Sequence, residues 1–382
     1  MDKSFEIKSE ESELSASELQ RYSRHIVIPE IGIEGQQKLK SAKVLLIGAG
    51  GLGSPAGMYL AAAGVGTIGI VEYDEVSYSN LQRQILFNTE DVGNSKAQIA
   101  KQRLNSLNPE IEIVLHETKL TKDNALGLIG NYDIVVDGSD NFATRYLVND
   151  ACVMSGKPFV SGSVLRFEGQ VSFFDSTDGP CYRCLFPKPP AESPSCSDAG
   201  VLGVLPGIIG SLQANEVIKF IIGKGDLLIG RLLKLDALKM KFTELHFEKD
   251  LNCPECSENP LITELSNNDE TFITKENQTC EITVEELKQK FDRKENFILL
   301  DVREPYEKEI ADIGGVNIPF NSLSDKLDEF NKNNEFVVYC HVGARSYYAV
   351  EFMKDNGFKN VKNLIGGIDE WAVKIDSIVR KY

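Results

Sequence analysis

The chain has 382 residues, of which 42% are hydrophobic and 26% charged, and its formal net charge at pH 7 is −16. This length is too great for one ordinary domain and suits two, and the composition is that of a folded globular protein. The acidic balance argues against a nucleic-acid-binding protein, which needs local positive charge to meet phosphates. We therefore expect no direct nucleic-acid partner.

The amino-terminal residues 1–14 are acidic and contain no apolar core, so we expect a disordered tail and no signal peptide. The most apolar stretch, residues 201–222, is interrupted by Pro206 and by polar side chains. It falls short of the roughly 18–20 clean apolar residues that a membrane span requires. The sequence predicts a cytoplasmic protein with no membrane association.

Short apolar runs alternate with helical patterns in the first part of the chain. Residues 15–24 predict a capped amphipathic helix, and residues 42–47 predict a strand that ends in the turn GAGGLGS. A helix at 55–63 follows this turn. The further expected strands are 67–71, 112–115, 132–137 and 159–164, and the further expected helices are 96–107 and 141–155. This order is typical of a Rossmann-like doubly wound parallel sheet in an α/β protein.

The pattern changes after residue 171. Strands are expected at 171–175, 231–237 and 241–247, with a proline-rich loop and an apolar helix from Val201 between the first two. We expect these strands to extend the sheet in antiparallel fashion. Residues 259–277 are polar and aperiodic, which predicts a linker between a domain at 15–258 and a smaller α/β domain at 278–382.

Gly48, Gly50 and Gly53 form a GxGxxG turn between an expected strand and an expected helix. Such a turn brings phosphate oxygens close to backbone N–H groups at a helix N-terminus. Glu72 ends the next strand, 24 residues after Gly48, where a ribose-binding acid belongs. This pattern alone would indicate an NAD-dependent oxidoreductase.

The residues that follow these strands favour ATP chemistry instead. Asn80 and Arg83 lie in the segment SNLQRQ, Lys96 begins a helix, and Asp140 and Asn141 follow a buried strand. A triphosphate under attack needs cations that neutralise the leaving group and an aspartate that holds Mg²⁺. Surface ion pairs are the alternative explanation for each of these residues taken singly.

Four of the eight cysteines form two CxxC pairs, Cys181 with Cys184 and Cys253 with Cys256. Four thiolates make the complete tetrahedral ligand set of a structural Zn²⁺ site, which leaves no open position for catalysis. The long gap between the pairs predicts a cross-brace of the antiparallel extension. Two unconnected buried pairs or a redox CxxC are the alternatives.

Cys340 ends an expected buried strand and begins a Cx4R turn that closes at Arg345, before a helix. Successive backbone amides at a helix N-terminus stabilise a thiolate, and the same cradle suits the terminal sulfur of a persulfide. The related phosphatase loop is one residue longer and fits a phosphate. A buried structural cysteine is the alternative.

The motifs RYSRHIVIPEIGIEGQQKLKSAKVLLIGAGGLGS, SNLQRQ, VDGSDN, CYRC and CPEC, in this order, resemble those of the MoeB/ThiF family over residues 15–258. Members of this family resemble ubiquitin-activating enzymes and adenylate the C-terminal glycine of a ubiquitin-like sulfur carrier. The resemblance implies that Asp140 holds Mg²⁺ and that Arg24 reaches the ATP site of the neighbouring subunit in a homodimer. Glu72 stands where the family usually has aspartate. The residues implied to line ATP are Gly51, Glu72, Ser79, Asn80, Leu81, Gln82, Arg83, Lys96, Asp140 and Asn141.

Cys196 lies in the Ser/Pro-rich loop before the apolar helix, where proximity to a helix N-terminus favours the thiolate. In the family that the chain resembles, a cysteine of this loop is proposed to attack the activated carrier. A merely tolerated loop cysteine is the alternative.

Residues 278–382 resemble a rhodanese domain through DVREPYE, ADIGGVNIP, the Cys340 turn and LIGGIDEW. This resemblance implies that Cys340 carries a persulfide and that Asp301 and Arg303 have a structural role. His341 stands where many rhodaneses carry a basic residue.

Together the two resemblances imply a fused adenylyltransferase and sulfurtransferase that uses ATP, Mg²⁺ and Zn²⁺. Its partner would be a ubiquitin-like sulfur carrier ending in Gly-Gly, and its sulfur donor a persulfide, a desulfurase or thiosulfate. The expected catalytic residues are Cys340, Cys196, Arg83, Asp140 and Arg345. Three alternatives remain open: an oxidoreductase with a regulatory rhodanese-like domain, an enzyme that transfers a ubiquitin-like protein as a thioester, and a non-catalytic scaffold.

Overall fold

The structure is a computed structural model that describes residues 13–187, 200–266 and 280–382. The first two of these ranges form one compact unit and the third forms another. Within the described ranges, no helix combines the length and the apolar character needed to cross a membrane.

Three short helices precede the first strand: α1 (Ala16–Arg21), α2 (Ser23–Ile26) and α3 (Gly32–Ser41). The expected single helix over 15–24 is therefore wrong, because the chain leaves helical geometry at Tyr22. The Tyr22 side chain is buried at this break, and its hydroxyl accepts a hydrogen bond from Asn108 Nδ2 at 2.8 Å. Tertiary packing of one aromatic ring thus ends the helix earlier than its amphipathic pattern predicts.

An eight-stranded sheet forms the centre of the first unit, in the order β3-β2-β1-β4-β5-β6-β7-β8. The strands from β3 to β5 are parallel, and those from β5 to β8 pair in antiparallel fashion. This arrangement confirms the Rossmann-like sheet and its antiparallel extension. The bounds are β1 (Lys43–Ile47), β2 (Thr67–Val71), β3 (Glu112–His116), β4 (Ile134–Asp137), β5 (Phe159–Leu165), β6 (Glu168–Phe174), β7 (Arg231–Asp236) and β8 (Lys241–His246).

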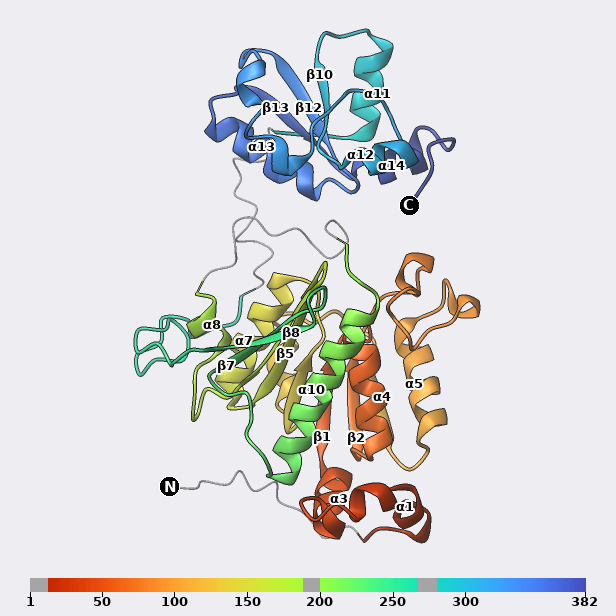
Figure 1. Cartoon of the computed structure of the whole chain (residues 1–382), viewed down its shortest axis with the longest axis vertical. Helices are drawn as coiled ribbons and strands as arrows, with labels where there is room; N and C mark the ends of the chain where they lie inside the picture. Colours follow the sequence, from red (N-terminus) through yellow and green to blue (C-terminus); the bar gives the residue numbers. More distant parts are fainter. Residues whose placement is uncertain (1–12, 188–199, 267–279) are drawn as a thin grey trace. The chain divides into compact units, whose positions relative to one another are not determined.

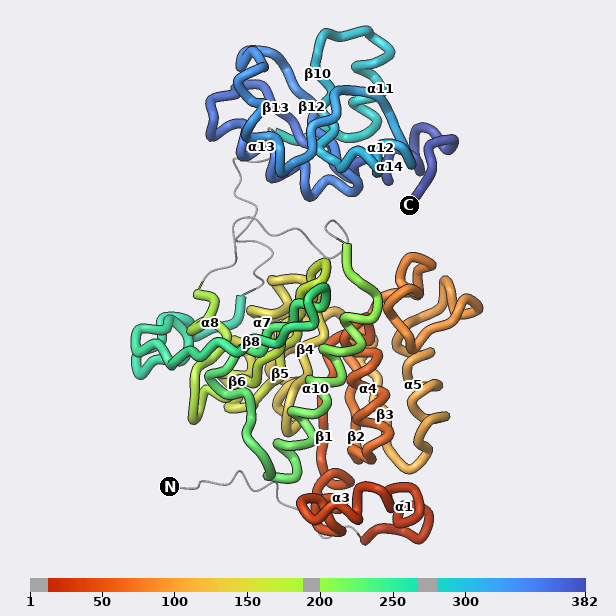
Figure 2. Tube along the Cα trace, in the orientation of Figure 1, coloured from red at the N-terminus to blue at the C-terminus, as the bar shows by residue number. Residues whose placement is uncertain are grey.

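Helices cover both faces of this sheet (Figure 1). Successive side chains of a strand point to opposite faces. On β1, Val44 and Leu46 therefore belong to the core beneath α4, α5 and α10, whereas Leu45 and Ile47 belong to the core beneath α6 and α7. Figure 2 shows α10 running alongside α4. The bounds are α4 (Gly53–Ala63), α5 (Lys96–Leu107), α6 (Ala125–Ile129), α7 (Phe142–Ser155), α8 (Tyr182–Leu185) and α10 (Val204–Ile222).

Two helices begin at other residues than the sequence pattern indicates. Helix α4 begins at Gly53, before Pro55, because proline lacks an N–H and is tolerated in the first helical turn, where that donor has no partner. Helix α10 begins at Val204 because Val201 is held in a β-bridge with Arg166.

The second unit contains a five-stranded parallel sheet in the order β11-β10-β12-β13-β9. Alternate side chains of β12 and of the residue after it again belong to two cores. Val338 and Cys340 lie on the side of α13, and Val337 and Tyr339 lie on the side of α14. This confirms the smaller α/β domain. The bounds are β9 (Glu281–Ile282), α11 (Val284–Asp292), β10 (Ile298–Asp301), α12 (Pro305–Ile310), β11 (Val316–Asn317), β12 (Glu335–Tyr339), α13 (Ala344–Asp355), β13 (Asn360–Leu364) and α14 (Gly367–Lys374).

Candidate active sites

The glycine turn lies at the carboxyl end of β1. Gly48 has a φ of +84°, a conformation that residues with a side chain rarely adopt. A Cβ atom on Gly53 would overlap the carbonyl oxygen of Gly48. Glycine at these two positions lets the chain pass directly from β1 into α4. The start of α4 therefore lies at the edge of the sheet where the parallel strands end, and the N-terminus of a helix in this place can face an anion.

Glu72 directly follows β2 and is buried beside the glycine turn. Its Oε2 accepts a hydrogen bond from the Ala49 N–H at 3.0 Å. Its Oε1 accepts hydrogen bonds from the N–H groups of Tyr73 at 2.8 Å and Asp74 at 2.9 Å. The structure thus places this carboxylate next to the turn and fixes it through three backbone donors.

Two side chains of the SNLQRQ segment lie against the glycine turn. A Cβ atom on Gly51 would lie 3.7 Å from Arg83 Cγ, and a Cβ atom on Gly50 would lie 3.5 Å from Gln84 Nε2. Arg83 Nη1 donates to the carbonyl oxygen of Ser79 at 3.0 Å. The fold therefore brings Gly51 and Arg83 together as the sequence suggests.

Gln84 is the side chain in this segment that sequence analysis missed as a site residue. It is buried, and its Oε1 has no hydrogen-bond partner within the described ranges. A buried acceptor of this kind usually finds a partner. Only the GxGxxG turn against which it packs could have drawn attention to it.

The other residues of this segment differ in their contacts. Asn80 Oδ1 accepts a long hydrogen bond of 3.4 Å from the Ser77 N–H. Leu81 is half-buried against the core of the first unit, and Gln82 and Ser79 are exposed.

Lys96 begins α5, and its buried Nζ forms an ion pair with Asp74 Oδ2 at 3.1 Å. Asp140 and Asn141 follow β4. Asn141 caps α7 by accepting a hydrogen bond from the Thr144 N–H at 2.8 Å, and Asp140 is exposed. Since β1, β2 and β4 are parallel neighbours, their carboxyl ends bring the glycine turn, the Lys96 pair and Asp140 to one edge of the sheet.

Hydrogen bonds to Asp137 hold the loop that carries Asp140 in place. This carboxylate is fully buried at the end of β4. It accepts hydrogen bonds from the Ser139 N–H at 3.0 Å, the Ser139 hydroxyl at 2.6 Å and the Ser161 hydroxyl at 3.1 Å. Arg145 Nη2 also donates to the Ser139 carbonyl at 3.0 Å. These bonds position the exposed Asp140 without bringing Asp137 itself to the surface.

Arg24 is not brought to this edge within its own chain. It is exposed on α2, next to Tyr22, which packs against Gly64 at the C-terminal end of α4. The glycine turn lies at the other end of this 11-residue helix, which spans about 16 Å.

The four cysteines of the two CxxC pairs converge. Their sulfur atoms all lie within 4.8 Å of one another. Individual Sγ–Sγ distances are 3.9 Å for Cys181–Cys184, 3.6 Å for Cys181–Cys253 and 3.4 Å for Cys184–Cys256. A tetrahedron with Zn–S bonds of about 2.3 Å has edges of about 3.8 Å, so the cluster could hold Zn²⁺.

Crowding of these thiols separates their pKa values. Hydrogen bonds from Cys181 and Cys256 lower the pKa of Cys184, and the contact with Cys184 raises the pKa of Cys181. The Asp250 N–H also donates to Cys184 Sγ at 3.4 Å. The thiolate form of Cys184 is therefore favoured. Cys196, the other cysteine to which the sequence analysis gives a catalytic role before residue 258, lies outside the described residues.

In the second unit, Cys340 lies at the end of β12 and is fully buried. Its Sγ accepts hydrogen bonds from the Gly343 N–H at 3.2 Å and from the Ser346 hydroxyl at 3.4 Å. Gly343 has a φ of +97° immediately before α13 begins. Donors at a helix N-terminus thus face the sulfur, and such donors stabilise a thiolate.

Arg345, in the same turn, is paired with Glu307 of α12. Arg345 Nη1 donates to Glu307 Oε2 at 2.7 Å, and Arg345 Nη2 donates to Glu307 Oε1 at 2.6 Å. The resemblance to rhodaneses did not indicate this partner.

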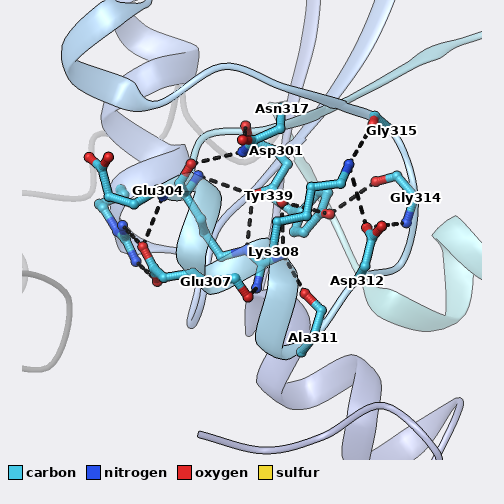
Figure 3. A network of polar contacts seen from close by, with 12 residues as sticks. Asp301, Glu304, Glu307, Lys308, Ala311, Asp312, Gly314, Gly315, Asn317 and Tyr339 are labelled. Atoms are coloured by element: carbon cyan, nitrogen blue, oxygen red, sulfur yellow. Dashed lines mark hydrogen bonds and ion pairs between the residues drawn. The ribbon is translucent and has the colours of Figure 1, made fainter.

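Asp301 and Arg303 form a fully buried ion pair with N–O distances of 2.9 and 2.7 Å. Arg303 also donates to the carbonyl oxygens of Glu307 and Ala311, and the Tyr339 hydroxyl donates to Asp301 Oδ2 at 3.0 Å. Figure 3 shows the Asp301, Tyr339 and Glu307 side chains within one network. The network joins β10, α12 and β12.

Two family models match the chain. Residues 22–255 match the ThiF family, and residues 283–374 match the rhodanese-like domain.

Curated relatives match almost the whole chain. The protein of Mycobacterium tuberculosis H37Rv named "Probable adenylyltransferase/sulfurtransferase MoeZ" is 45% identical over 376 residues, which cover 94% of each chain. The adenylyltransferase and sulfurtransferase MOCS3 of Culex quinquefasciatus is 42% identical over 392 residues, which cover 96% of this chain and 90% of the relative.

Solved structures of E. coli MccB share the fold of the first unit. The structure with AMPCPP and MccA has a TM-score of 0.56 and 25% identity, and covers 62% of this chain and 74% of that chain. The structure with MccA-N7isoASN has a TM-score of 0.57 and 24% identity, and covers 62% and 75%. The chain therefore belongs to the ThiF family, carries a rhodanese-like domain after its ThiF domain, and is an adenylyltransferase and sulfurtransferase.

Proposed function

We propose that this enzyme adenylates the C-terminal glycine of a ubiquitin-like sulfur carrier ending in Gly-Gly and then converts that carboxylate to a thiocarboxylate. The observation that carries the proposal is the donor-lined Cys340 turn in the same chain as a ThiF-type glycine turn. A carboxylate is a poor electrophile, so activation by ATP must come before sulfur can enter. The protein works in this proposal as a homodimer in the cytoplasm.

In the first step, a carboxylate oxygen of the carrier attacks the α-phosphorus of ATP, and pyrophosphate leaves. Arg83 and Lys96 would neutralise the charge of the phosphates, and the N–H groups at the start of α4 would approach them. The crystal structure of MccB, which is 25% identical, was solved with AMPCPP, and this supports nucleotide binding by the shared fold. The unpaired Oε1 of Gln84 is an acceptor suited to a donor group of the nucleotide.

The chain has side chains that suit two metal ions, Mg²⁺ and Zn²⁺. The exposed carboxylate of Asp140 suits Mg²⁺, which prefers oxygen ligands and supplies charge neutralisation to phosphates. The sulfur atoms of Cys181, Cys184, Cys253 and Cys256 suit a closed, structural Zn²⁺ site.

In the second step, the terminal sulfur of a persulfide on Cys340 attacks the acyl carbon, and AMP leaves. The product is an acyl disulfide between the carrier and Cys340. A thiolate, assigned in this proposal to Cys196, attacks Cys340 Sγ and releases the carrier thiocarboxylate. An external thiol must then reduce the Cys196–Cys340 disulfide.

Substitution of Asp140 tests the adenylation half. We expect Asp140→Ala to lower carrier-dependent ATP–pyrophosphate exchange by at least about a hundredfold, because the metal would lose a ligand at the phosphates. The rhodanese reaction of Cys340, in which sulfur passes from a donor to cyanide, should be unchanged. Asp133→Ala is the matched control, since Asp133 precedes β4 at its opposite end and accepts a hydrogen bond from the Lys43 N–H. Exchange within threefold of the wild-type rate in Asp140→Ala would refute the assignment.

A further inference from the structure

The turn around Cys340 contains an arginine, but its charge is balanced. Arg345 lies between Gly343 and Ser346, which both donate to Cys340 Sγ. Its guanidinium forms two hydrogen bonds with Glu307, and the exposed fractions of the two side chains are 14% and 7%. A pair so little exposed is weakly screened by solvent. Arg345 therefore adds almost no net positive charge beside the sulfur.

Glu307 is held in its ionised form. Burial raises the pKa of Glu307. The hydrogen bonds from Arg345 and from the Glu304 N–H lower it by more than burial raises it, so the pKa lies below its ordinary value. The Glu304 N–H donates to Glu307 Oε2 at 3.0 Å, and the Tyr382 hydroxyl donates to Oε1 at 3.1 Å. Three neighbours thus fix the carboxylate in place.

Tyr382 joins this pair to the second arginine of the unit. Its hydroxyl accepts a hydrogen bond from Arg303 Nη1 at 2.7 Å, and Arg303 is itself paired with Asp301. The Tyr382 ring stacks on His341 with a centroid distance of 4.5 Å and an interplanar angle of 19°. Both arginines near the turn are therefore matched by a carboxylate within one connected network.

The balanced charge bears on the choice of sulfur donor. Thiosulfate is a dianion, and it must approach a thiolate, so the like charges repel unless a net cation stands beside the sulfur. Backbone N–H groups remain as donors, but these are partial charges only. A persulfide with a single net negative charge meets less repulsion.

We infer that Glu307, by neutralising Arg345, makes Cys340 select persulfide donors over thiosulfate. This inference rests on the proposed function, in which Cys340 accepts the sulfur. The Cys340 thiolate attacks the terminal sulfur of the persulfide, the donor S–S bond breaks, and the donor thiolate leaves with the electron pair. With thiosulfate the same attack would expel sulfite.

Four proteins form the test: the wild type, Glu307→Gln, Arg345→Gln and the double variant. The site charge relative to wild type is +1 in Glu307→Gln, −1 in Arg345→Gln and zero in the double variant. Glutamine keeps the size of glutamate and can still accept a hydrogen bond. The measurement is the rate of thiocyanate formation from cyanide, as kcat/KM for thiosulfate and for cysteine persulfide, with circular dichroism to verify folding.

We expect the ratio of kcat/KM for thiosulfate to that for cysteine persulfide to follow the site charge. It should rise about tenfold in Glu307→Gln, fall several-fold in Arg345→Gln and return close to the wild-type ratio in the double variant. Using the ratio removes any general loss of activity, and Arg345→Gln keeps the test decisive if Glu307→Gln is poorly folded. A ratio that is unchanged in the folded single variants, or that moves in the same direction in both, would overturn the inference. If the wild type transfers sulfur from neither donor, the proposed function of Cys340 fails instead.

Discussion

Backbone N–H groups hold one side chain of a candidate site in each unit. Glu72 accepts three of them at the carboxyl end of β2, and Cys340 accepts one from Gly343 at the carboxyl end of β12. In both units a parallel strand is followed by a glycine-containing turn that leads into a helix. In both units, backbone N–H groups thus donate to a side chain at the carboxyl end of a parallel strand.

The two thiols of the proposed sulfur transfer should separate by function. We expect Cys340→Ala to eliminate sulfur transfer from a persulfide donor and to leave carrier adenylation unchanged, because no part of the ATP-binding edge uses Cys340. Cys196→Ala should leave both half-reactions intact and slow only thiocarboxylate release. Mass spectrometry of the carrier measures the product as a gain of about 16 Da, since sulfur replaces oxygen.

Cys280→Ala is the matched control for this pair, because Cys280 belongs to the second unit and packs at the edge of the same core as Cys340. It should thiolate the carrier at the wild-type rate. The mechanism would be wrong if Cys340→Ala still did so with a persulfide as the single sulfur source.

At this scale, the sequence predicts residues whose partners are close in the chain. Gly48, Gly53 and Cys340 each lie in a turn whose geometry follows from a few neighbouring residues. Glu307 escaped notice because it meets Arg345 across 38 positions, and only the folded sheet brings α12 to the Cys340 turn. Glu72 shows a different kind of error, in which a local pattern suggests the wrong ligand. Its spacing from Gly48 alone would have indicated a nicotinamide dinucleotide.

At the scale of elements, the first CxxC pair is anchored on α7 through helix α8. The Tyr182 N–H donates to Asn149 Oδ1 at 2.8 Å, and Arg183 makes hydrogen bonds of 2.7 and 2.6 Å to the buried carboxylate of Asp150. The second pair follows β8 at the end of the antiparallel extension. A metal shared by both pairs would therefore join the far end of the sheet to the helix beneath it.

We expect about one Zn²⁺ per chain, released by strong chelators or by unfolding. Cys256→Ser should lose the metal and lower Tm by about 10 °C, since a structural Zn²⁺ contributes several kcal/mol and 1 kcal/mol corresponds to about 2–4 °C in a domain of this size. Elemental analysis and calorimetry in reducing buffer provide the measurements. Cys152→Ser, which alters a buried cysteine outside the cluster, should keep its zinc. Metal-free protein with an unchanged Tm would contradict the structural role.

Strand and helix patterns predicted the parallel sheet of the first unit and its antiparallel extension, because a strand buried on both faces is a short apolar run and a surface helix has a polar face. The break at Tyr22 and the start of α10 were missed. Both depend on contacts distant in sequence, with Asn108 in the first case and with Arg166 in the second.

At the scale of the whole molecule, the position of Arg24 requires a second chain if this residue is to meet ATP. Its helix α2 lies at the end of α4 away from the glycine turn. The neighbouring α2–α3 segment exposes Val27, Ile28 and Ile33, with exposed fractions of 71%, 40% and 54%. Exposed apolar side chains gathered in one segment suit a protein interface.

Mixing two inactive variants tests this arrangement. Arg24→Ala and Asp140→Ala should each lack adenylation activity, and dissociation followed by reassociation of the mixture should restore about a quarter of the wild-type activity. In a C2 dimer, half of the randomly formed dimers pair the two variants, and one of the two sites in each is then complete. Light scattering verifies the dimer. A mixture that stays inactive would exclude a role for Arg24 across the interface.

The position of Cys340 limits how far its sulfur can travel. The residue is fully buried, its Sγ is bonded to Gly343 and Ser346, and the Tyr339 hydroxyl fixes the end of the strand from the other face of the sheet. A persulfide extends this sulfur by a single S–S bond of about 2 Å. The terminal sulfur of the persulfide therefore extends less far than one residue of extended chain. The acceptor must come to the sulfur. A carboxyl terminus of two glycines, with no side chains and with wide backbone freedom, is the form of acceptor best able to approach a buried sulfur.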